Sequence, residues 1–167
     1  MRLLLKRTFP ALWVAGAAFM LWKLVCLVTN SPYPIHVVIS ESMAPAFHRG
    51  DIIFLSNWEH EIRVGDIPVV WFKEKALPMV HRAVKINWRQ KPGENIFEQL
   101  ILTKGDNNEL DDVALYPTGQ NLVRRDQIVG LVRGYLPFLG WISLYLKEKV
   151  WIQYALIGGL TLISMIV

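Results

Sequence analysis

The sequence predicts a mainly β protein: a curved antiparallel β domain between an N-terminal transmembrane helix and a short apolar C-terminal helix. Three observations predict this arrangement. Apolar residues gather at the two ends of the chain, although the hydrophobic fraction of 53% is only modestly above the usual ~45–50%. The middle holds short β-branched or aromatic runs that Gly, Pro, Asn and Asp separate. No segment with helical periodicity interrupts these runs, which argues against a parallel βαβ sheet.

Residues 9–29 are expected to form the membrane anchor. The apolar run from Phe9 to Val28 is close to the roughly 20 residues that a helix needs to cross a bilayer. It is longer than the ~7–15-residue apolar core of a cleaved signal peptide, and no Ala-x-Ala site closes it. Lys23 lies in the distal third of the run, where its aliphatic stem can carry the charge to the far interface. A contact between Lys23 and another subunit is the alternative interpretation.

The charges on either side of the anchor predict its orientation. Residues 1–8 carry three cations, whereas the segment from Asn30 to Ser40 carries no lysine or arginine. The positive-inside rule therefore predicts a single-pass protein with a cytoplasmic N-terminus, residues 1–8, and a translocated middle domain, residues 30–149.

The strands of the middle domain are expected where apolar, β-branched residues cluster. Glycine-aspartate pairs at 50–51, 65–66 and 105–106 mark turns between them. The predicted strands are Ile35–Ile39, Ile52–Leu55, Ile67–Phe72, Met79–Ile86, Leu100–Thr103 and Ile128–Tyr135.

Residues 150–167 are expected to form a short apolar helix in or at the membrane. Only Gln153, Thr161 and Ser164 break the apolar run. At ~1.5 Å per residue its length is about 27 Å, slightly less than the ~30 Å hydrocarbon core. A second membrane span, a helix in the interface and a helix buried in a partner are all compatible with this length.

The charge and the cysteine content of the chain argue against nucleic-acid binding and against disulfide or cysteine-based metal sites. The formal net charge is +4, but the basic residues form no stripe, so nucleic acid is not a predicted partner. The only cysteine, Cys26, lies inside the anchor. An intramolecular disulfide and a cysteine-based metal site are thereby excluded. The sequence predicts neither a metal nor another cofactor.

Ser42 is the candidate nucleophile. It lies between a predicted strand and the turn at Pro45, close to the anchor. An exposed serine would occupy such a position in an enzyme that cuts a substrate at a membrane surface. The alternative is an ordinary turn serine that caps its own backbone.

A base and an acid for this serine can be sought among the remaining polar residues. Of the four histidines, His81 lies in an apolar predicted strand, where its ring must find a polar partner. A structural histidine and a catalytic base are both compatible with that position. The acid-rich turn after Leu100–Thr103 offers Asp106 and Asp112 as partners for the imidazole, and solvated turn residues are the alternative.

Six short motifs follow one another between Ile35 and Tyr135: Ser-x-Ser-Met-x-Pro (40–45), Arg-Gly-Asp (49–51), Val-Gly-Asp (64–66), Val-His-Arg-x-Val (80–84), Thr-Lys-Gly-Asp-Asn-Asn (103–108) and Ile-Val-Gly (128–130). Their order resembles the type I signal peptidases. The bacterial enzymes carry a lysine base where this chain has His81, so the resemblance is to the branch in the endoplasmic reticulum, whose histidine is shared with archaeal and some spore-former enzymes. The small size and the two apolar ends are similar to the catalytic subunit of the eukaryotic signal peptidase complex.

The resemblance implies a serine endopeptidase with Ser42 as nucleophile, His81 as general base and Asp112 as the acid that orients it. Asp106 matches a second, supporting aspartate of the family. The backbone N–H of Ser42, helped by the hydroxyl of Ser40, is expected to hold the oxyanion.

The chain departs from the family pattern at two positions beside the nucleophile. Ala44 stands where an acidic residue is usual, and Glu41 stands where glycine is common. Neither residue belongs to the inferred triad, but both bear on the detail of the substrate cleft.

The resemblance also implies a place and partners. The substrates would be signal peptides of secretory preproteins, and the partners would be other subunits of a signal peptidase complex and the lipid bilayer of the endoplasmic reticulum. Three alternatives remain at this point: an archaeal or bacterial-type signal peptidase at the plasma membrane, a non-enzymatic membrane-anchored β binding module, and a self-cleaving repressor-like β domain. The last lacks support because the chain has an anchor and no DNA-binding helical unit.

Overall fold

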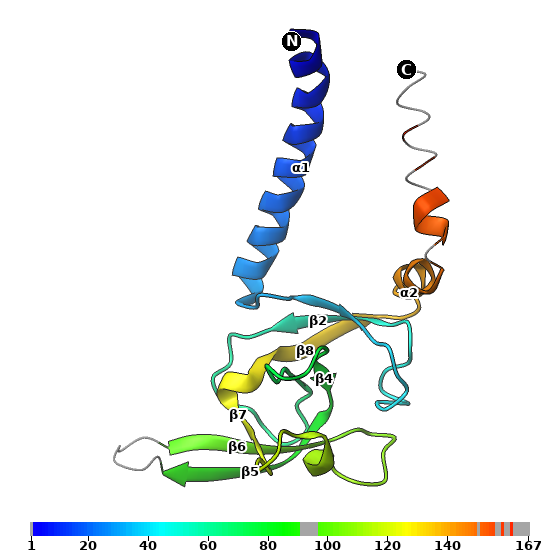
Figure 1. The fold of residues 1–167 in the computed structure, drawn as a ribbon. Coiled ribbons are helices and arrows are strands. Elements are labelled where there is room, and N and C mark those ends of the chain that lie inside the picture. The colour runs from blue at the N-terminus through cyan, green and yellow to red at the C-terminus, as the bar shows by residue number, and fades with distance from the viewer. Residues whose placement is uncertain (1, 91–96, 150, 156–157, 159–160, 162–167) are drawn as a thin grey trace.

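The computed structural model describes residues 2–90, 97–149, 151–155, 158 and 161 (Figure 1). Two short 3-10 helices, η1 (Asp112–Leu115) and η2 (Arg125–Gln127), join the later strands. The helices and strands, in chain order, are α1 (Arg2–Thr29), β1 (Ile35–Val37), β2 (Ile52–Ser56), β3 (Pro68–Val70), β4 (Met79–Val80), β5 (Arg82–Gln90), β6 (Phe97–Lys104), β7 (Val123–Arg124), β8 (Ile128–Leu136) and α2 (Trp141–Glu148).

The long helix α1 stands away from the β domain (Figure 1). Its 18-residue window Leu12–Thr29 has a mean hydropathy of 1.9, and none of these residues is buried. This length and composition suffice to cross a membrane. The helix begins at Arg2, well before the apolar run, because helical hydrogen bonding does not require apolar side chains.

Hydrogen bonds attach the end of α1 to the loop after β2. The indole Nε1 of Trp58 donates to the carbonyl oxygen of Val28 at 2.7 Å. The backbone N–H of Asn57 donates to the carbonyl oxygen of Thr29 at 2.8 Å, and the side chain of Asn30 donates to the carbonyl oxygen of Asn57 at 3.0 Å. The first two bonds occupy carbonyls that a helix end leaves free, so α1 and the β domain are joined at a defined position.

The β domain consists of two sheets in which every strand pair is antiparallel, as predicted. The first sheet has the order β1-β2-β8-β3-β4, and the second has the order β5-β6-β7. The β2–β8 register shifts between Phe54 and Leu55, and the β3–β8 register shifts between Val69 and Val70. Such irregularities increase local twist, which curls the first sheet.

The predicted strand Met79–Ile86 is a single strand in sequence but two strands in the structure. Its first part, β4, pairs with β3 in the first sheet, and its second part, β5, pairs with β6 in the second sheet. His81 lies at the junction. The prediction of one continuous strand was therefore wrong, because apolar alternation does not reveal where a chain passes from one sheet to another.

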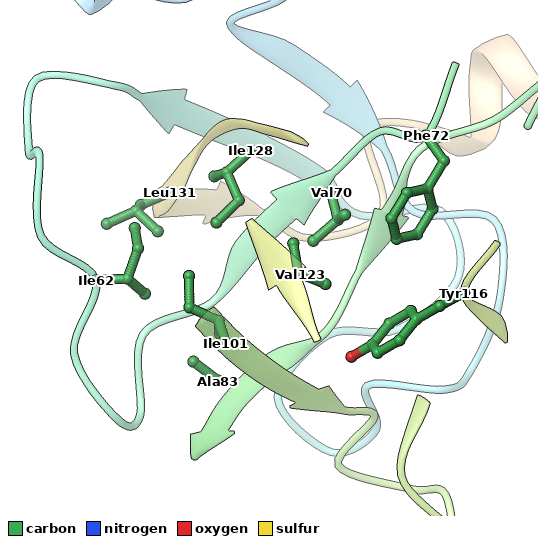
Figure 2. Packing of buried hydrophobic residues seen from close by; sticks show 9 residues of the cluster. All are labelled: Ile62, Val70, Phe72, Ala83, Ile101, Tyr116, Val123, Ile128 and Leu131. Carbon is green, nitrogen blue, oxygen red and sulfur yellow. The ribbon is translucent and has the colours of Figure 1, made fainter. Parts of the chain in front are cut away.

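The main core lies between the two sheets (Figure 2). It draws side chains from β3, β5, β6, β7 and β8, and each fully buried aliphatic side chain stabilises the fold by about 1.5–3 kcal/mol. The buried members are Ile62, Val70, Phe72, Ala83, Ile101, Tyr116, Val123, Ile128 and Leu131. A second cluster packs under the turn that carries Ser42, and its buried members are Val38, Met43, Phe47, Ile53, Leu55 and Val69.

Four short elements were not predicted: the 3-10 helices η1 and η2, the strand β7 and the helix α2. The strand β7 is only two residues long. The helix α2 lies inside the range predicted as β, residues 30–149, and on the same side of the β domain as α1 (Figure 1). Of the apolar helix predicted over 150–167, residues 151–155 are helical. Residues 150, 156–157, 159–160 and 162–167 lie outside the described part of the chain.

Candidate active site

Ser42 lies on the turn that follows β1. Beneath it, Met43 is 2% exposed and belongs to the second core cluster. From the side, the backbone N–H of Asn107 donates to the carbonyl oxygen of Ser42 at 2.9 Å. The side-chain amide of Asn107 donates to the carbonyl oxygen of Glu41 at 3.2 Å. The acid-rich turn after β6 therefore holds the backbone on both sides of the serine.

The side chain of Glu41 holds the same turn from the other direction. One carboxylate oxygen accepts a hydrogen bond from the backbone N–H of Arg49 at 3.0 Å, and the other lies 3.0 Å from Nδ1 of His48. The hydrogen bond from Arg49 and then the bond from His48 lower the pKa of Glu41. Glu41, one of the two departures from the family pattern, thus stabilises the bend around the serine.

Ser42, His81 and Asp112 form one hydrogen-bonded line. Nε2 of His81 lies 3.0 Å from Oγ of Ser42, and Nδ1 lies 2.6 Å from Oδ2 of Asp112. His81 is 5% exposed, and Asp112 has no exposed surface. A carboxylate accepts but does not donate, so Nδ1 carries the proton and Nε2 of the neutral ring accepts from the serine hydroxyl. This is the arrangement that converts an alcohol into a nucleophile.

The buried carboxylate of Asp112 has a second donor. The hydroxyl of Thr103 donates to Oδ2 at 2.6 Å. Oδ1 has no hydrogen-bond partner among the described residues. Behind Thr103, the hydroxyl of Tyr116 lies 2.9 Å from Oγ1 and accepts from the backbone N–H of Thr103 at 3.0 Å. Burial raises the pKa of Tyr116, which keeps its hydroxyl protonated.

Asp106, the other acid considered for the base, is bound to Arg82. Nε of Arg82 donates to Oδ1 at 2.8 Å, and Nη2 donates to Oδ2 at 2.6 Å. The hydrogen bonds to Asp106 raise the pKa of Arg82. Of the two aspartates that the residue pattern left open, Asp112 contacts His81 and Asp106 supports the turn through Arg82. Asp111 is exposed and caps η1 by accepting from the backbone N–H of Val113 at 3.2 Å.

Of the remaining polar candidates, Ser40 and His36 line the cleft beside Ser42 and His81, and His60 does not. Oγ of Ser40 is 3.2 Å from Oγ of Ser42, so it lies beside the point where a carbonyl carbon would be attacked. His36 lines the neighbouring cleft, and Nε2 of its ring is buried with no hydrogen-bond partner from the described residues. Burial lowers the pKa of His36. His60 lies in the loop after β2.

A cleft of about 370 Å³ opens in front of the serine. One wall is the chain from His36 to Ser40, and the other is the chain from Pro78 to His81. These walls include or continue β1 and β4, the two edges of the five-stranded sheet. The curl of that sheet therefore brings both edges to one cleft, and edge strands offer free backbone groups to an extended peptide.

Thr103 and Tyr116 are the polar site residues that sequence reasoning did not single out. Thr103 lies in a quoted motif but was considered only as the end of a strand, and Tyr116 carries no sequence signal of its own. No group of three or more His, Cys, Asp or Glu residues that could hold a metal ion occurs in the part of the chain that the structure describes.

No family model matches the chain. Curated relatives nevertheless resemble it over most of their length. The signal peptidase complex catalytic subunit SEC11 of Eremothecium gossypii is 50% identical over 152 residues, 90% of this chain and 88% of the relative. The protein of the same name from Candida albicans is 45% identical over 154 residues, 92% of this chain and 89% of the relative. That from Ogataea parapolymorpha is 44% identical over 158 residues, 92% and 90% of the two chains.

Proposed function

The chain belongs to the family of signal peptidase complex catalytic subunits, and from this premise we propose that Ser42, His81 and Asp112 are the catalytic triad of a serine endopeptidase that removes signal peptides. The observation that carries the proposal is the 3.0 Å contact between Nε2 of His81 and Oγ of Ser42 at the rim of the cleft. Three segments far apart in sequence meet there, as a serine peptidase requires.

The chemistry follows from the atoms in contact. His81 takes the proton of Ser42 while Oγ bonds to the scissile carbonyl carbon, and the carbonyl oxygen becomes an oxyanion. The imidazolium then gives this proton to the leaving amine as the peptide bond breaks. Water, deprotonated by His81, hydrolyses the resulting ester and restores the serine. Asp112 holds the imidazole tautomer and stabilises the imidazolium in both halves of the reaction.

The oxyanion needs donors on the side of the serine turn. We assign this role to the backbone N–H of Ser42 and the hydroxyl of Ser40, whose Oγ lies 3.2 Å from the nucleophile. One such donor contributes about 3 kcal/mol to transition-state stabilisation. The proposal therefore predicts that Ser40→Ala lowers kcat by about 100-fold with little change in KM.

The substrate enters as an extended strand. Both walls of the cleft are sheet edges, so a peptide can hydrogen-bond to backbone on each side while its alternate side chains face the apolar lining. Signal-peptide cleavage sites carry small residues at alternate positions, which suits such a cleft.

We further propose that α1 is the anchor and that the cleft faces the lumen of the endoplasmic reticulum. In this arrangement residues 1–8 are cytoplasmic, residues 9–29 span the membrane, residues 30–149 form the lumenal peptidase domain, and residues 150–167 lie in or at the membrane. The cations before the apolar run support this orientation. The relatives are named as subunits of a complex, which supports partner subunits here and favours this function over the plasma-membrane enzyme and the binding module.

The decisive experiment compares triad variants with matched neighbours. Ser42→Ala, His81→Ala and Asp112→Asn, expressed in full-length chain and purified with its partner subunits, are each expected to lower preprotein cleavage by at least ~1000-fold. His60→Ala and Asp111→Asn remove exposed groups of the same types and should retain normal cleavage. Near-normal processing by any triad variant in an intact complex would remove that residue from the mechanism.

A further inference from the structure

Two buried hydroxyls continue the line of the proposed triad beyond its acid. Thr103 has no exposed surface and lies on β6, and Tyr116 is 6% exposed and follows η1. The ring of Tyr116 packs 5.7 Å from that of Phe72 within the main core (Figure 2). Its hydroxyl leaves this apolar cluster and reaches both the N–H and the hydroxyl of Thr103.

The donors in this network can be assigned by elimination. Oδ2 of Asp112 can only accept, so the hydroxyl proton of Thr103 points to it. The backbone N–H of Thr103 already donates to the phenolic oxygen of Tyr116. The phenolic proton therefore points to Oγ1 of Thr103, which is the acceptor within reach. The hydrogen bonds run in one direction, from Tyr116 through Thr103 to Asp112.

We propose that Thr103 and Tyr116 are positioning residues of the catalytic site, which fix the carboxylate of Asp112 for the base. The proposal rests on the triad assignment above. Oδ2 receives the protons of both Thr103 and His81, whereas Oδ1 has no partner among the described residues. Without Thr103, the bond to His81 is the only hydrogen bond from the described part of the chain that holds this carboxylate.

Such a single bond would not define the orientation of the acid. The terminal torsion of an aspartate is broad, so a carboxylate with one donor can rotate while it keeps that donor. Rotation would change the direction of the Nδ1 bond and move Nε2 away from Ser42. A small displacement of a base from its nucleophile has a large effect on rate. Tyr116 acts one step further away, because it orients the hydroxyl of Thr103 and polarises it.

Variants that keep the shape of the site isolate the two hydroxyls. Thr103→Val removes a hydrogen bond to a charged group, which is worth about 10- to 100-fold, and we expect kcat to fall by at least ~10-fold with KM unchanged. Thr103→Ser keeps the hydroxyl and should retain most of the activity. Tyr116→Phe removes a bond between neutral groups and should lower kcat about threefold.

The most discriminating measurement is the kcat of the double variant, compared with the kcat of each single variant. If Tyr116 acts through Thr103, Tyr116→Phe lowers kcat in the wild-type chain but has no further effect on kcat in Thr103→Val. Two independent structural roles would instead give multiplied losses. Each kcat is measured on the full chain purified with its partner subunits, normalised to intact complex by size-exclusion chromatography, so that a poorly folded variant does not imitate a slow one.

Specific results would overturn the inference. Equal kcat in Thr103→Val and the wild type, equal losses in Thr103→Ser and Thr103→Val, or fully multiplied effects in the double variant would each exclude the positioning role. Ser42→Ala and Asp112→Asn are assayed alongside. If these two are inactive while Thr103→Val is normal, the positioning role fails and the triad stands. If they are active, the triad itself fails.

Discussion

Two parallel hydrogen bonds, of 2.8 and 2.6 Å, join Asp106 to Arg82, the residue that follows His81 in the chain. Arg82 also donates to the carbonyl oxygen of Gly65 at 3.0 Å. One guanidinium therefore connects the start of β5, the turn before β3 and the acid-rich turn after β6. Because Asn107 of that last turn holds the backbone of Ser42, the ion pair helps to fix the positions of His81 and Ser42 relative to one another.

The two members of this ion pair should behave as one unit. The pair is partly buried and bidentate, so we expect it to contribute about 1–2 kcal/mol to stability. Arg82→Gln and Asp106→Asn should each lower kcat, and the double variant should be no slower than the worse single one. Thermal unfolding and cleavage rates of all four proteins test this. Arg89→Gln, which breaks the exposed pair with Glu98 on the β5–β6 hairpin, is the matched control and should leave kcat unchanged. Losses that multiply would show that the two residues act separately.

Much of the fold could be predicted from the local sequence pattern. The features that could not be predicted depend on tertiary contacts. Short β-branched runs between glycine-aspartate turns marked most strands. The helix α2 was missed because its eight residues form barely two turns inside a long apolar region, where pattern does not distinguish a helix from a strand. The passage from β4 to β5 at His81 was missed because partner choice along a strand depends on the rest of the sheet.

In the candidate site too, the sequence pattern predicted some features and tertiary contacts decided the others. The motifs singled out Ser42, His81 and two aspartates, but the residue pattern left open which aspartate contacts His81. That choice depends on where a 3-10 turn places Asp112 and on the position of Arg82, which binds Asp106. The contact between Thr103 and Asp112 joins a strand to that turn, and no spacing of residues in the sequence predicts it.

Stability is expected to depend on His36 in mild acid. Its pKa is lowered in the folded protein because burial disfavours the charged ring. The unfolded chain therefore binds the proton first, below an ordinary value of about 6.5. The stability that a neutral His36 allows is complete above that pH and is lost as the pH falls towards the lowered value.

The test compares the free energy of unfolding, measured with urea, between pH 7.5 and 5.5. His36→Phe removes the titrating ring and should flatten part of this decline, by less than about 1 kcal/mol per pH unit, since the ring is only half-buried. His60→Ala removes an exposed ring and should leave the decline as it is. A decline that is identical in His36→Phe and the wild type would assign it to other groups.

Arg125 is expected to be the cation of the 124–125 basic pair that stabilises the fold. Its guanidinium donates to Oδ1 of Asn57 at 2.6 Å and to the carbonyl oxygens of Glu59, His60 and Ile128. Burial lowers the pKa of Arg125. A lysine ammonium cannot reproduce this fork, so Arg125→Lys should cost about 2 kcal/mol of unfolding free energy.

The neighbouring residue supplies the control. Arg124 is half-exposed, and its ion pair with Asp126 at 3.4 Å lies at the surface. Such pairs contribute little, so Arg124→Lys should change the unfolding free energy by less than about 0.5 kcal/mol. Urea unfolding of both variants measures the difference, and similar losses in the two would refute the assignment.

Gly50 provides the last prediction, because both its backbone and its surroundings exclude a side chain. Its φ is +92°, and an added Cβ would overlap the indole of Trp141, the first residue of α2. Gly65 has a similar φ of +97° with nothing within 4 Å of the added atom. Gly65→Ala should therefore show only the backbone cost, about 1 kcal/mol, whereas Gly50→Ala adds the displacement of the indole and should exceed about 2 kcal/mol.

The indole of Trp141 also contacts Arg49, which follows Ser42 in the same turn region. The guanidinium of Arg49 lies 5.4 Å from the centre of the Trp141 ring, and Arg49 forms an ion pair with Glu148 at the other end of α2. The backbone N–H of Arg49 donates to the carboxylate of Glu41, the residue before Ser42. Gly50→Ala should therefore lower kcat as well as stability, and Gly65→Ala should not. Trp141→Ala in the Gly50→Ala background removes the clash and should recover part of the unfolding free energy. If the two alanine variants are equally stable, or if that second change recovers nothing, the close approach of α2 to Gly50 does not exist in solution.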